Sequence, residues 1–559
     1  MCGIWLYLHK SGKKTLSYGE LYDSFMKIES RGPDRSSFLK LSDYNLYIGF
    51  HRLSIMDVST RGDQPFIHET EEKVYYLICN GEIYNYKELC EKYDITLKSG
   101  SDCEVLLHLF LKIGLDAMVK ELNAEYAFCI VEINKLLKDV KLHISRDHCG
   151  IRPLFITGDE NELILSSELK GSPFLFKDKE YKVDQFKPRH SATISTLDDN
   201  LYDLQYKQYI DFADIKTSIY DLEEAKELIN NTFRKAVELR LMSDPQIELG
   251  FALSGGLDSS LVASIASEYY RKFGKKIKTF SIGMEGGTDE KYAKMVAKYI
   301  DSDHTHILLS EEEFLDAIQD VVRTIETYCL TTVRASTGQY LLAKWIREHT
   351  NLKVVLIGDL SDELCSGYFY NFLAPNADEL HLETVRILND IHYYDVLRAD
   401  RGITRFGLEA RCPFSDINFI KLYLSIDPTL RMPTFKNLEK WLLRTSFEKD
   451  NILPIEVLMR NKEAFSDAIT SVKRSWYEII QERVNSMTSD LEFTEEIKKY
   501  NHMKPVSKES LYFRKIFENN FGTNELTSKV TPYNWLPKWV NTNEPSARTL
   551  NIYKQKNET

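Results

Sequence analysis

Residues 247–260 read IELGFALSGGLDSS, an apolar segment that runs directly into a glycine turn and a string of small polar residues. The apolar part predicts a buried strand, and the pattern that begins at Ser260 predicts a helix after the turn. A second strand is expected at residues 279–282, a second helix from Asp289, and a further strand at residues 353–357. Strands that alternate with helices in this way predict βαβ units on a parallel sheet.

The chain on either side of this α/β pattern has a different character. We place two domains at residues 2–205 and 222–550, with a polar linker between them. An amphipathic helix at residues 222–241 opens the second domain, and residues after about 380 read as largely helical. The first domain shows short strands with turn signals and two helical stretches, which predicts a layered α+β fold.

Composition excludes several classes of function. The chain has 559 residues and 72 Lys and Arg against 84 Asp and Glu, so its net charge is -12 and neither nucleic acid nor an anionic membrane is expected as a principal partner. It contains no apolar run long enough for a membrane span and no readable secretory signal. The nine cysteines are scattered and form no Cys-x-x-Cys pair, which predicts a cytoplasmic protein without a zinc or disulfide framework.

Cys2 is the most informative residue of the first domain. Removal of Met1 would leave a thiol and a free α-amine on one residue. An α-amine has a pKa of about 7.7–8.0 and a thiol about 8.5, so the amine can take the thiol proton at neutral pH without a histidine. A cysteine at this place could also be accidental, and the neighbouring segments decide between the two interpretations.

Five segments of the first domain occur in a characteristic order. They are residues 2–4 (CGI), 31–34 (RGPD), 49–53 (GFHRL), 80–85 (NGEIYN) and 101–104 (SDCE). In this order they resemble the class II glutamine amidotransferases. The resemblance implies an αββα N-terminal-nucleophile sandwich in which Cys2 attacks the side-chain amide of glutamine, giving a γ-glutamyl thioester and ammonia.

The resemblance also implies roles for individual residues. Arg52 would bind the glutamine α-carboxylate and Asp102 the α-ammonium, while Asn80 and Gly81 would form the oxyanion hole. An Asn-Gly pair is equally typical of a hairpin turn between strands, and both interpretations can hold together. The full set of glutamine-binding residues implied is Arg52, Leu53, Ser54, Ile55, Met56, Asn80, Gly81, Glu82 and Asp102.

In the second domain, the segment from Ser254 to Ser260 lies between a strand and a helix, where backbone N–H groups can hold an anion. It lacks the Gly-Lys-Ser/Thr ending of a Walker A motif. It could be only a turn and helix cap, but it resembles the pyrophosphate loop of ATP pyrophosphatases. Asp258, inside a loop built for anions, would need a cation, and Mg²⁺ is the natural one.

Six further segments carry a second resemblance. They are residues 331–336 (TTVRAS), 357–364 (IGDLSDEL), 398–401 (RADR), 407–411 (GLEAR), 462–467 (KEAFSD) and 545–550 (PSARTL). Their order is similar to that in the synthetase domain of the glutamine-hydrolysing asparagine synthetases of animal type, and the similarity runs from residue 2 to about residue 550. It implies glutamine, aspartate and ATP as substrates, AMP and pyrophosphate as products, and a homodimer.

The same resemblance implies which residues form the nucleotide site. Asp258 and Asp362 would hold Mg²⁺, Arg334 and Lys462 would neutralise phosphates, and Asp359 and Lys462 would be catalytic. The ATP-binding residues implied are Leu253, Ser254, Gly255, Gly256, Asp258, Ser259, Ile282, Arg334, Ile357 and Gly358.

The chain departs from the family pattern at one sensitive place. The family usually reads Gly-Glu-Gly-Ser-Asp-Glu where residues 358–363 read GDLSDE. Asp359 therefore reaches about 1.5 Å less than a glutamate, and a misplacement of about 1 Å can cost on the order of 100-fold in rate. Leu360 stands where a glycine would permit unusual backbone angles. Two alternatives stay open: an amidotransferase that uses another carboxylate, and a degenerate synthetase that binds nucleotide without turnover.

Overall fold

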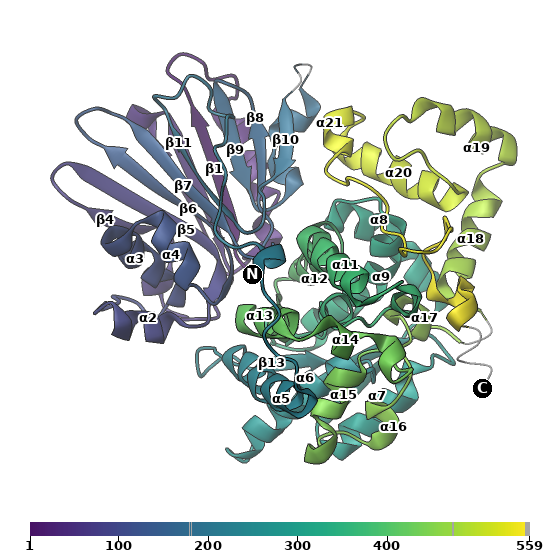
Figure 1. Cartoon of the computed structure of the whole chain (residues 1–559). Helices are drawn as coiled ribbons and strands as arrows, with labels where there is room; N and C mark the ends of the chain where they lie inside the picture. Colours follow the sequence, from purple (N-terminus) through teal and green to yellow (C-terminus); the bar gives the residue numbers. More distant parts are fainter. Residues whose placement is uncertain (178, 180, 472–473, 554–559) are drawn as a thin grey trace.

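A computed structural model describes residues 1–177, 179, 181–471 and 474–553. The first domain contains two six-stranded antiparallel sheets (Figure 1). The first sheet has the order β10 (Lys182–Gln185), β8 (Phe155–Gly158), β9 (Glu162–Ser166), β1 (Gly3–His9), β3 (Leu46–Arg52), β2 (Arg35–Leu41). The second has the order β12 (Lys207–Gln208), β11 (His190–Ser195), β7 (Val140–Arg146), β6 (Ala124–Asn134), β5 (Lys73–Ile83), β4 (Phe66–Glu69).

Apolar side chains on both faces of each sheet produce four layers. Alternate residues such as Ile4 on β1 and Cys129 on β6 meet between the sheets. The other face of the first sheet packs on α1 (Tyr18–Met26), where Trp5 contacts Phe25. The other face of the second sheet is covered by α2 (Tyr86–Lys92), α3 (Val105–Ile113) and α4 (Leu115–Glu121). The expected αββα sandwich is confirmed.

The sheet of the second domain is parallel, as the alternating pattern predicted. Its order is β15 (Asp303–Leu308), β14 (Lys278–Gly283), β13 (Leu249–Ala252), β16 (Val354–Leu356), β17 (Glu409–Arg411). The helices around it are α5 (Leu222–Leu239), α6 (Leu257–Arg271), α7 (Asp289–Tyr299), α8 (Glu311–Ile325), α9 (Leu330–His349) and α10 (Ser361–Leu364). Helix α6 begins at Leu257, three residues before the expected Ser260, because Gly256 is its N-cap.

The rest of the chain consists mostly of helices, the last of which lie beside α8 (Figure 1). These helices are α11 (Ala377–Asp390), α12 (Asp395–Thr404), α13 (Ile417–Ser425), α14 (Pro428–Arg431), α15 (Trp441–Ser446), α16 (Ile455–Leu458), α17 (Phe465–Ala468), α18 (Trp476–Met487), α19 (Asp490–Glu496), α20 (Lys508–Phe521) and α21 (Glu525–Ser528). Within the described part of the chain, no helix combines the length and apolar character needed to cross a bilayer.

Buried ion pairs join the two domains. Arg240, the C-cap residue of α5, lies 3.1 Å from Glu125 of β6 and 3.0 Å from Asp416. All three side chains are buried, so each charge depends on its partners for solvation. Removing Arg240 would take one cationic partner from Glu125, which keeps Arg152 at 2.8 Å, so these pairs favour the observed contact between the domains.

Candidate functional site

Cys2 lies at the start of β1, in contact with three elements of the first domain. Its backbone N–H donates to Asn80 Oδ1 at 3.1 Å, and its carbonyl accepts from Arg31 Nε at 3.0 Å. Its Sγ lies 3.9 Å from the carbonyl oxygen of Leu53. Burial raises the pKa of the Cys2 thiol to about 11. A protonated thiol is a poor nucleophile, so attack by Cys2 needs a base that takes its proton.

Asn80 and Gly81 lie inside strand β5, opposite Ala127 and Tyr126 of β6. The interpretation of this pair as a hairpin turn is therefore wrong. Gly81 is required by close approach instead, because a Cβ there would come within 2.4 Å of the Glu125 carbonyl oxygen. Asn80 commits its Oδ1 to Cys2, while its buried Nδ2 has no partner among the described residues. An unused donor beside the thiol is what an oxyanion hole requires.

Arg52, the residue predicted to bind the glutamine carboxylate, is surrounded by its own loop. Its guanidinium donates to the Ser59 carbonyl at 2.6 Å and pairs with Asp63 at 2.5 Å. The carbonyls of Met56 and Asp57 accept from its other terminal nitrogen. Its role toward glutamine stays a prediction, and the loop that follows β3 is what fixes the direction of its side chain. Of the other predicted glutamine-binding residues in this segment, Leu53, Ser54 and Ile55 are buried and Met56 is half-buried.

Three buried carboxylates, Glu82, Asp102 and Glu409, interact with one another, and Glu409 also interacts with Cys2. Burial raises the pKa of Asp102 to about 6 and that of Glu82 well above its usual value. Glu82 lies 3.3 Å from Arg411 of the second domain, and Glu409 lies 3.8 Å from the amino group of the buried Met1. Glu409 was not among the predicted site residues. Its motif, residues 407–411, marked the segment without indicating that strand β17 begins close to Cys2.

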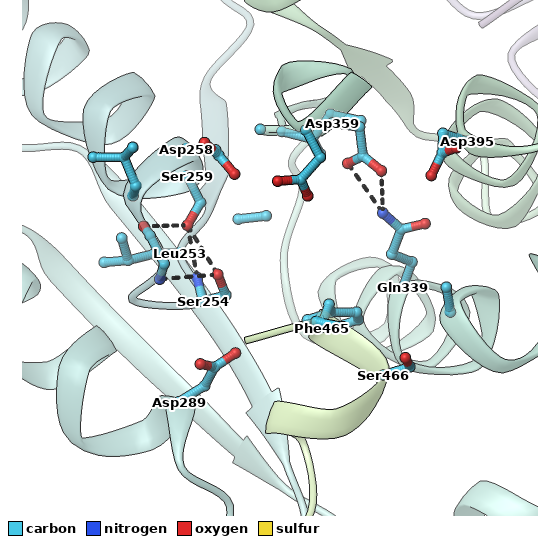
Figure 2. Close-up of a pocket in the computed structure, with 18 of the residues that line it drawn as sticks. Leu253, Ser254, Asp258, Ser259, Asp289, Gln339, Asp359, Asp395, Phe465 and Ser466 are labelled. Atoms are coloured by element: carbon cyan, nitrogen blue, oxygen red, sulfur yellow. Dashed lines mark hydrogen bonds between the residues drawn. The ribbon is translucent and has the colours of Figure 1, made fainter. Parts of the chain in front are cut away.

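A cavity of about 210 Å³ lies at the carboxyl ends of β13, β14 and β16. It brings together most of the residues predicted for ATP and catalysis, from segments up to 209 positions apart (Figure 2). The predicted residues that line it are Leu253, Ser254, Gly256, Asp258, Ser259, Ile282, Ile357, Gly358, Asp359, Asp362 and Lys462. The crevice beyond the carboxyl ends of parallel strands is the usual place for a ligand in such a fold.

The glycine loop before α6 has the geometry of an anion site. Gly256 caps the helix without a side-chain hydrogen bond, so the first N–H groups of α6 face the cavity end of the loop. The Ser254 and Ser259 hydroxyls lie 3.0 Å apart and close the turn. Gly255 faces the other way: its φ is +80° and a Cβ there would lie 2.4 Å from the backbone nitrogen of Ala293. The structure therefore gives Gly255 a packing role and leaves the cavity to its neighbours.

Asp258 and Asp362 face one another across a shared cation, Lys440. The Lys440 ammonium lies 2.7 Å from both carboxylate oxygens of Asp258 and 2.5 Å from Asp362 Oδ1. Lys462 contacts Asp362 Oδ2 at 2.6 Å. Burial opposes ionisation, yet the two lysines hold the pKa of Asp362 well below its usual range. Lys440 is 182 residues from Asp258, and nothing in its local sequence marked it as a site residue.

Asp359 is held from two sides. Gln339 of α9 donates from Nε2 to both of its carboxylate oxygens at 3.1 Å, and Arg398 of α12 donates at 3.0 Å (Figure 2). The next residue, Leu360, has a φ of +76°, the left-handed region that favours glycine. The sequence-based expectation of an unusual backbone angle here is therefore correct, and a buried leucine adopts it.

Arg334 does not line the cavity, although the sequence predicted it as a phosphate ligand. Its guanidinium pairs with Glu509 of α20 at 2.6 Å and with Glu544 at 2.5 Å. Thr331, Ala335 and Gln339 occupy the cavity face of α9 at helical spacing, and Arg334 falls outside that stripe. In this structure Arg334 holds the C-terminal segment, and contact with phosphate would require it to leave both glutamates.

Both domains match known families. Residues 1–196 match the glutamine amidotransferase domain, and residues 228–379 and 371–540 match asparagine synthase. The chain is 39% identical over 577 residues to an asparagine synthetase (glutamine-hydrolyzing) of Gallus gallus, covering 99% of each chain. A probable asparagine synthetase of Acanthamoeba polyphaga mimivirus is 39% identical over 574 residues, covering 99% of this chain and 100% of the relative. The Homo sapiens enzyme is 38% identical over 581 residues, with 99% of each chain covered.

Proposed function

Because the chain belongs to the glutamine-hydrolysing asparagine synthetases, we propose that Cys2 and the cavity around Asp359 are the two active sites of one such enzyme. The protein is an ATP-dependent amide-forming ligase. The strongest support for the proposal comes from the glutamine-cleaving site, where the buried Nδ2 of Asn80, next to Cys2, has no partner among the described residues. It supports a glutamine-cleaving site because a preorganised donor in a dry site stabilises an oxyanion at no cost of reorganisation.

In the first step, removal of Met1 would turn the Cys2 nitrogen into the base that its raised thiol pKa requires. The thiolate attacks the side-chain carbonyl carbon of glutamine, and the oxygen gains charge against Asn80 Nδ2 and the Gly81 N–H. Collapse of this intermediate breaks the C–N bond while the Cys2 amine returns its proton to the leaving nitrogen. Ammonia departs, and water hydrolyses the remaining thioester to glutamate. The hydrogen bond to Cys2 fixes the Asn80 amide, so its donor stays turned to the site.

In the second step, aspartate and ATP react in the cavity. The β-carboxylate of aspartate attacks the α-phosphorus of ATP, pyrophosphate leaves, and β-aspartyl-AMP remains. Lys462 and Lys440 supply positive charge beside the glycine loop, which supports a role in holding the departing phosphates. Asp359 then accepts the proton that ammonia loses as its nitrogen forms the new C–N bond and AMP departs.

Two carboxylates are a set that Mg²⁺ accepts, since this ion usually takes one or two carboxylates and completes its shell with phosphate oxygens and water. Asp258 and Asp362 fit this requirement: both turn toward the same point, where Lys440 now lies. Held by Asp258 and Asp362, Mg²⁺ would neutralise negative charge on the phosphates of ATP. Lys440 would move toward the phosphates to make room for it.

Ammonia would pass between the sites along β17. Glu409, at one end, lies 3.8 Å from the Met1 amino group, and the Cys412 thiol, just past the other end, contacts the Asp359 carbonyl oxygen. Three extended residues span about 10 Å, so one strand reaches from one site to the other. Met1 is fully buried beside Glu409, and its removal would open space there. A path through the protein would keep ammonia neutral and therefore nucleophilic.

We further propose a cytoplasmic location and a homodimeric assembly. A cytoplasmic location is supported by the nine cysteines, all of which are free. A homodimer is the assembly that the family resemblance implies, and sedimentation of the full chain would test it.

The test of the function is mass spectrometry of asparagine formed from amide-labelled glutamine, aspartate, ATP and Mg²⁺, with AMP measured in the same sample. We expect labelled asparagine and AMP in equal amounts. Labelled ammonia and glutamate without AMP would show that the residues around Asp359 no longer form a working synthetase. AMP and another labelled amide, with a different acid supplied, would show that the acceptor is not aspartate.

A further inference from the structure

Among the described residues that line the cavity, one neutral side chain has a buried hydrogen-bond acceptor without a partner. Gln339 lines the cavity beside Asp359, and its Oε1 is buried without a partner among the described residues (Figure 2). Buried polar atoms are almost always paired, because an unpaired one costs about 1–3 kcal/mol. A lone acceptor in the wall of a reaction cavity is therefore a place where a ligand donor is expected.

The orientation of the Gln339 amide is fixed by its neighbours. Its Nε2 lies 3.1 Å from both oxygens of Asp359, and one of these oxygens also accepts from Arg398 at 3.0 Å. A carboxylate only accepts hydrogen bonds, so the amide nitrogen has to face Asp359 and the amide oxygen has to face away from it. The acceptor is thus held at a set distance from the carboxylate by two hydrogen bonds.

The Gln339 Oε1 acceptor can bind only a reactant group that brings a hydrogen-bond donor. Phosphate and carboxylate oxygens of ATP and aspartate are themselves acceptors and gain nothing from Oε1. The N–H donors among the reactants are ammonia, the aspartate α-ammonium and the adenine amino group of ATP. The adenine takes no part in the reaction at Asp359, so ammonia and the α-ammonium remain. A carboxylate suits the ammonium better than a neutral amide does, and Asp395 and Glu363 both line the same cavity. A neutral amide oxygen suits neutral ammonia, because it binds an N–H without favouring protonation of the nitrogen.

The Gln339 amide also compensates for the shorter side chain of Asp359. An aspartate carboxylate ends about 1.5 Å short of a glutamate, a gap large enough to slow a reaction on the order of 100-fold. The oxygen of an amide lies about 2 Å from its nitrogen, so Gln339 carries an acceptor past the end of Asp359. Carboxylate and amide together present two acceptors to one incoming molecule.

We propose that Gln339 is an ammonia-positioning residue of the amide-forming step, with Nε2 holding Asp359 and Oε1 accepting an N–H of the attacking ammonia. This inference rests on the proposed role of Asp359. As the nitrogen lone pair forms the C–N bond to the β-carbonyl carbon, the bond from that carbon to the AMP oxygen breaks. One proton leaves nitrogen for Asp359, while a second N–H stays bonded to Gln339.

The test separates formation of the adenylate from its reaction with ammonia. In Gln339→Leu, exchange of labelled pyrophosphate into ATP in the presence of aspartate should stay within about twofold of the original chain. Asparagine synthesis from ammonia should fall about tenfold or more, mostly through a higher KM for ammonia, as expected for a lost hydrogen bond to a substrate. Glutamine hydrolysis at Cys2 should not change. Gln319→Leu, on the exposed face of α8, is the matched control and should match the original chain in all three assays.

A second variant tests the reach of the carboxylate. Asp359→Glu combined with Gln339→Leu should recover much of the synthesis lost in Gln339→Leu, because the longer side chain restores the missing length. Failure of this double variant, or synthesis in Gln339→Leu equal to the original chain, would overturn the proposal. A fall in pyrophosphate exchange with a higher KM for aspartate would also overturn it, since Oε1 would then serve the α-ammonium. Asp359→Ala tests the underlying function: full synthesis in that variant would remove the role of Asp359 itself.

Discussion

Arg31 and Asp400, which are 369 residues apart in the sequence, form a two-point ion pair across the domain interface, with N–O distances of 2.8 and 3.2 Å. Both side chains are buried. The Nε of Arg31 donates to the carbonyl of Cys2, and Asp400 follows Arg398, which holds Asp359, by two residues on α12. One helix turn of the second domain therefore touches both active sites.

Asp400→Asn should weaken glutamine hydrolysis more than ammonia-dependent synthesis. Loss of one partner from a buried ion pair costs about 3–5 kcal/mol, and Arg31 would keep only Glu168 as a carboxylate partner. We expect a lower midpoint of denaturant unfolding and a fall in glutaminase kcat of about tenfold, since small displacements at a nucleophile are costly. Asp301→Asn, at an exposed pair with Lys276, is the control and should shift stability by less than about 1 kcal/mol. Equal losses at both sites would contradict a local link to Cys2.

Cys2→Ala should abolish the use of glutamine and leave synthesis from ammonia intact. The thiol is the only group in the proposed mechanism that bonds to glutamine, while the cavity around Asp359 is built from other residues. The measurement is asparagine formed with glutamine and, separately, with ammonium chloride. Cys90→Ala, on α2, should behave like the original chain. Loss of both activities in Cys2→Ala would defeat the two-site mechanism.

Glutamine binding should weaken on the acid side of pH 6. Burial raises the pKa of Asp102 to about 6, so its carboxylate is charged above that pH and neutral below it. Only the charged form attracts the glutamine α-ammonium. Calorimetry in the Cys2→Ala background, which removes turnover, should give a Kd that rises about tenfold per pH unit below 6. Asp102→Asn should bind weakly at every pH, and an unchanged acid limb in that variant would assign the titration to another group.

Lys440→Met should make the protein depend on Mg²⁺ for stability. Its removal leaves Asp258 and Asp362 facing each other without their shared cation, which we expect to cost about 3–5 kcal/mol. A divalent ion that binds the folded state alone restores stability by mass action. The rise in Tm on adding Mg²⁺ should therefore be larger in Lys440→Met than in the original chain or in Lys276→Met, an exposed control. Equal rises would argue against Asp258 and Asp362 as the metal ligands.

Substitutions of Leu360 should reverse the usual order of alanine and glycine. The left-handed conformation costs a residue with a Cβ about 1–2 kcal/mol, and glycine avoids this cost. Loss of the buried leucine side chain costs about 2–5 kcal/mol, so both variants should be less stable than the original chain. Leu360→Gly should nevertheless unfold at higher denaturant than Leu360→Ala. The opposite order would mean that the backbone at this position relaxes when the side chain is shortened.

Local sequence was enough to predict the parallel sheet, a layered α+β first domain and the cavity position, while the αββα order of the layers came from the family resemblance. Strand-then-helix patterning places the loop after residue 253 and Gly358 at the carboxyl ends of adjacent strands, and parallel strands bring such ends together. Arg334 shows where this reasoning stops. Its motif predicted a phosphate-binding role, but the phase of the helix turns its side chain toward Glu509 and Glu544. Knowing that α9 starts at Leu330 would have fixed the helical phase and shown that Arg334 points away from the cavity.

The sequence by itself determined the family, the two domains and which segments carry the chemistry, because those depend on residue order and local periodicity. Only the tertiary structure decided what each side chain faces. Lys440 lies between Asp258 and Asp362, Glu409 lies beside Met1, and Gln339 holds Asp359. These contacts depend on how helices and strands pack and in which phase they present their side chains. Packing of that kind is set by the whole core, and no single segment contains it.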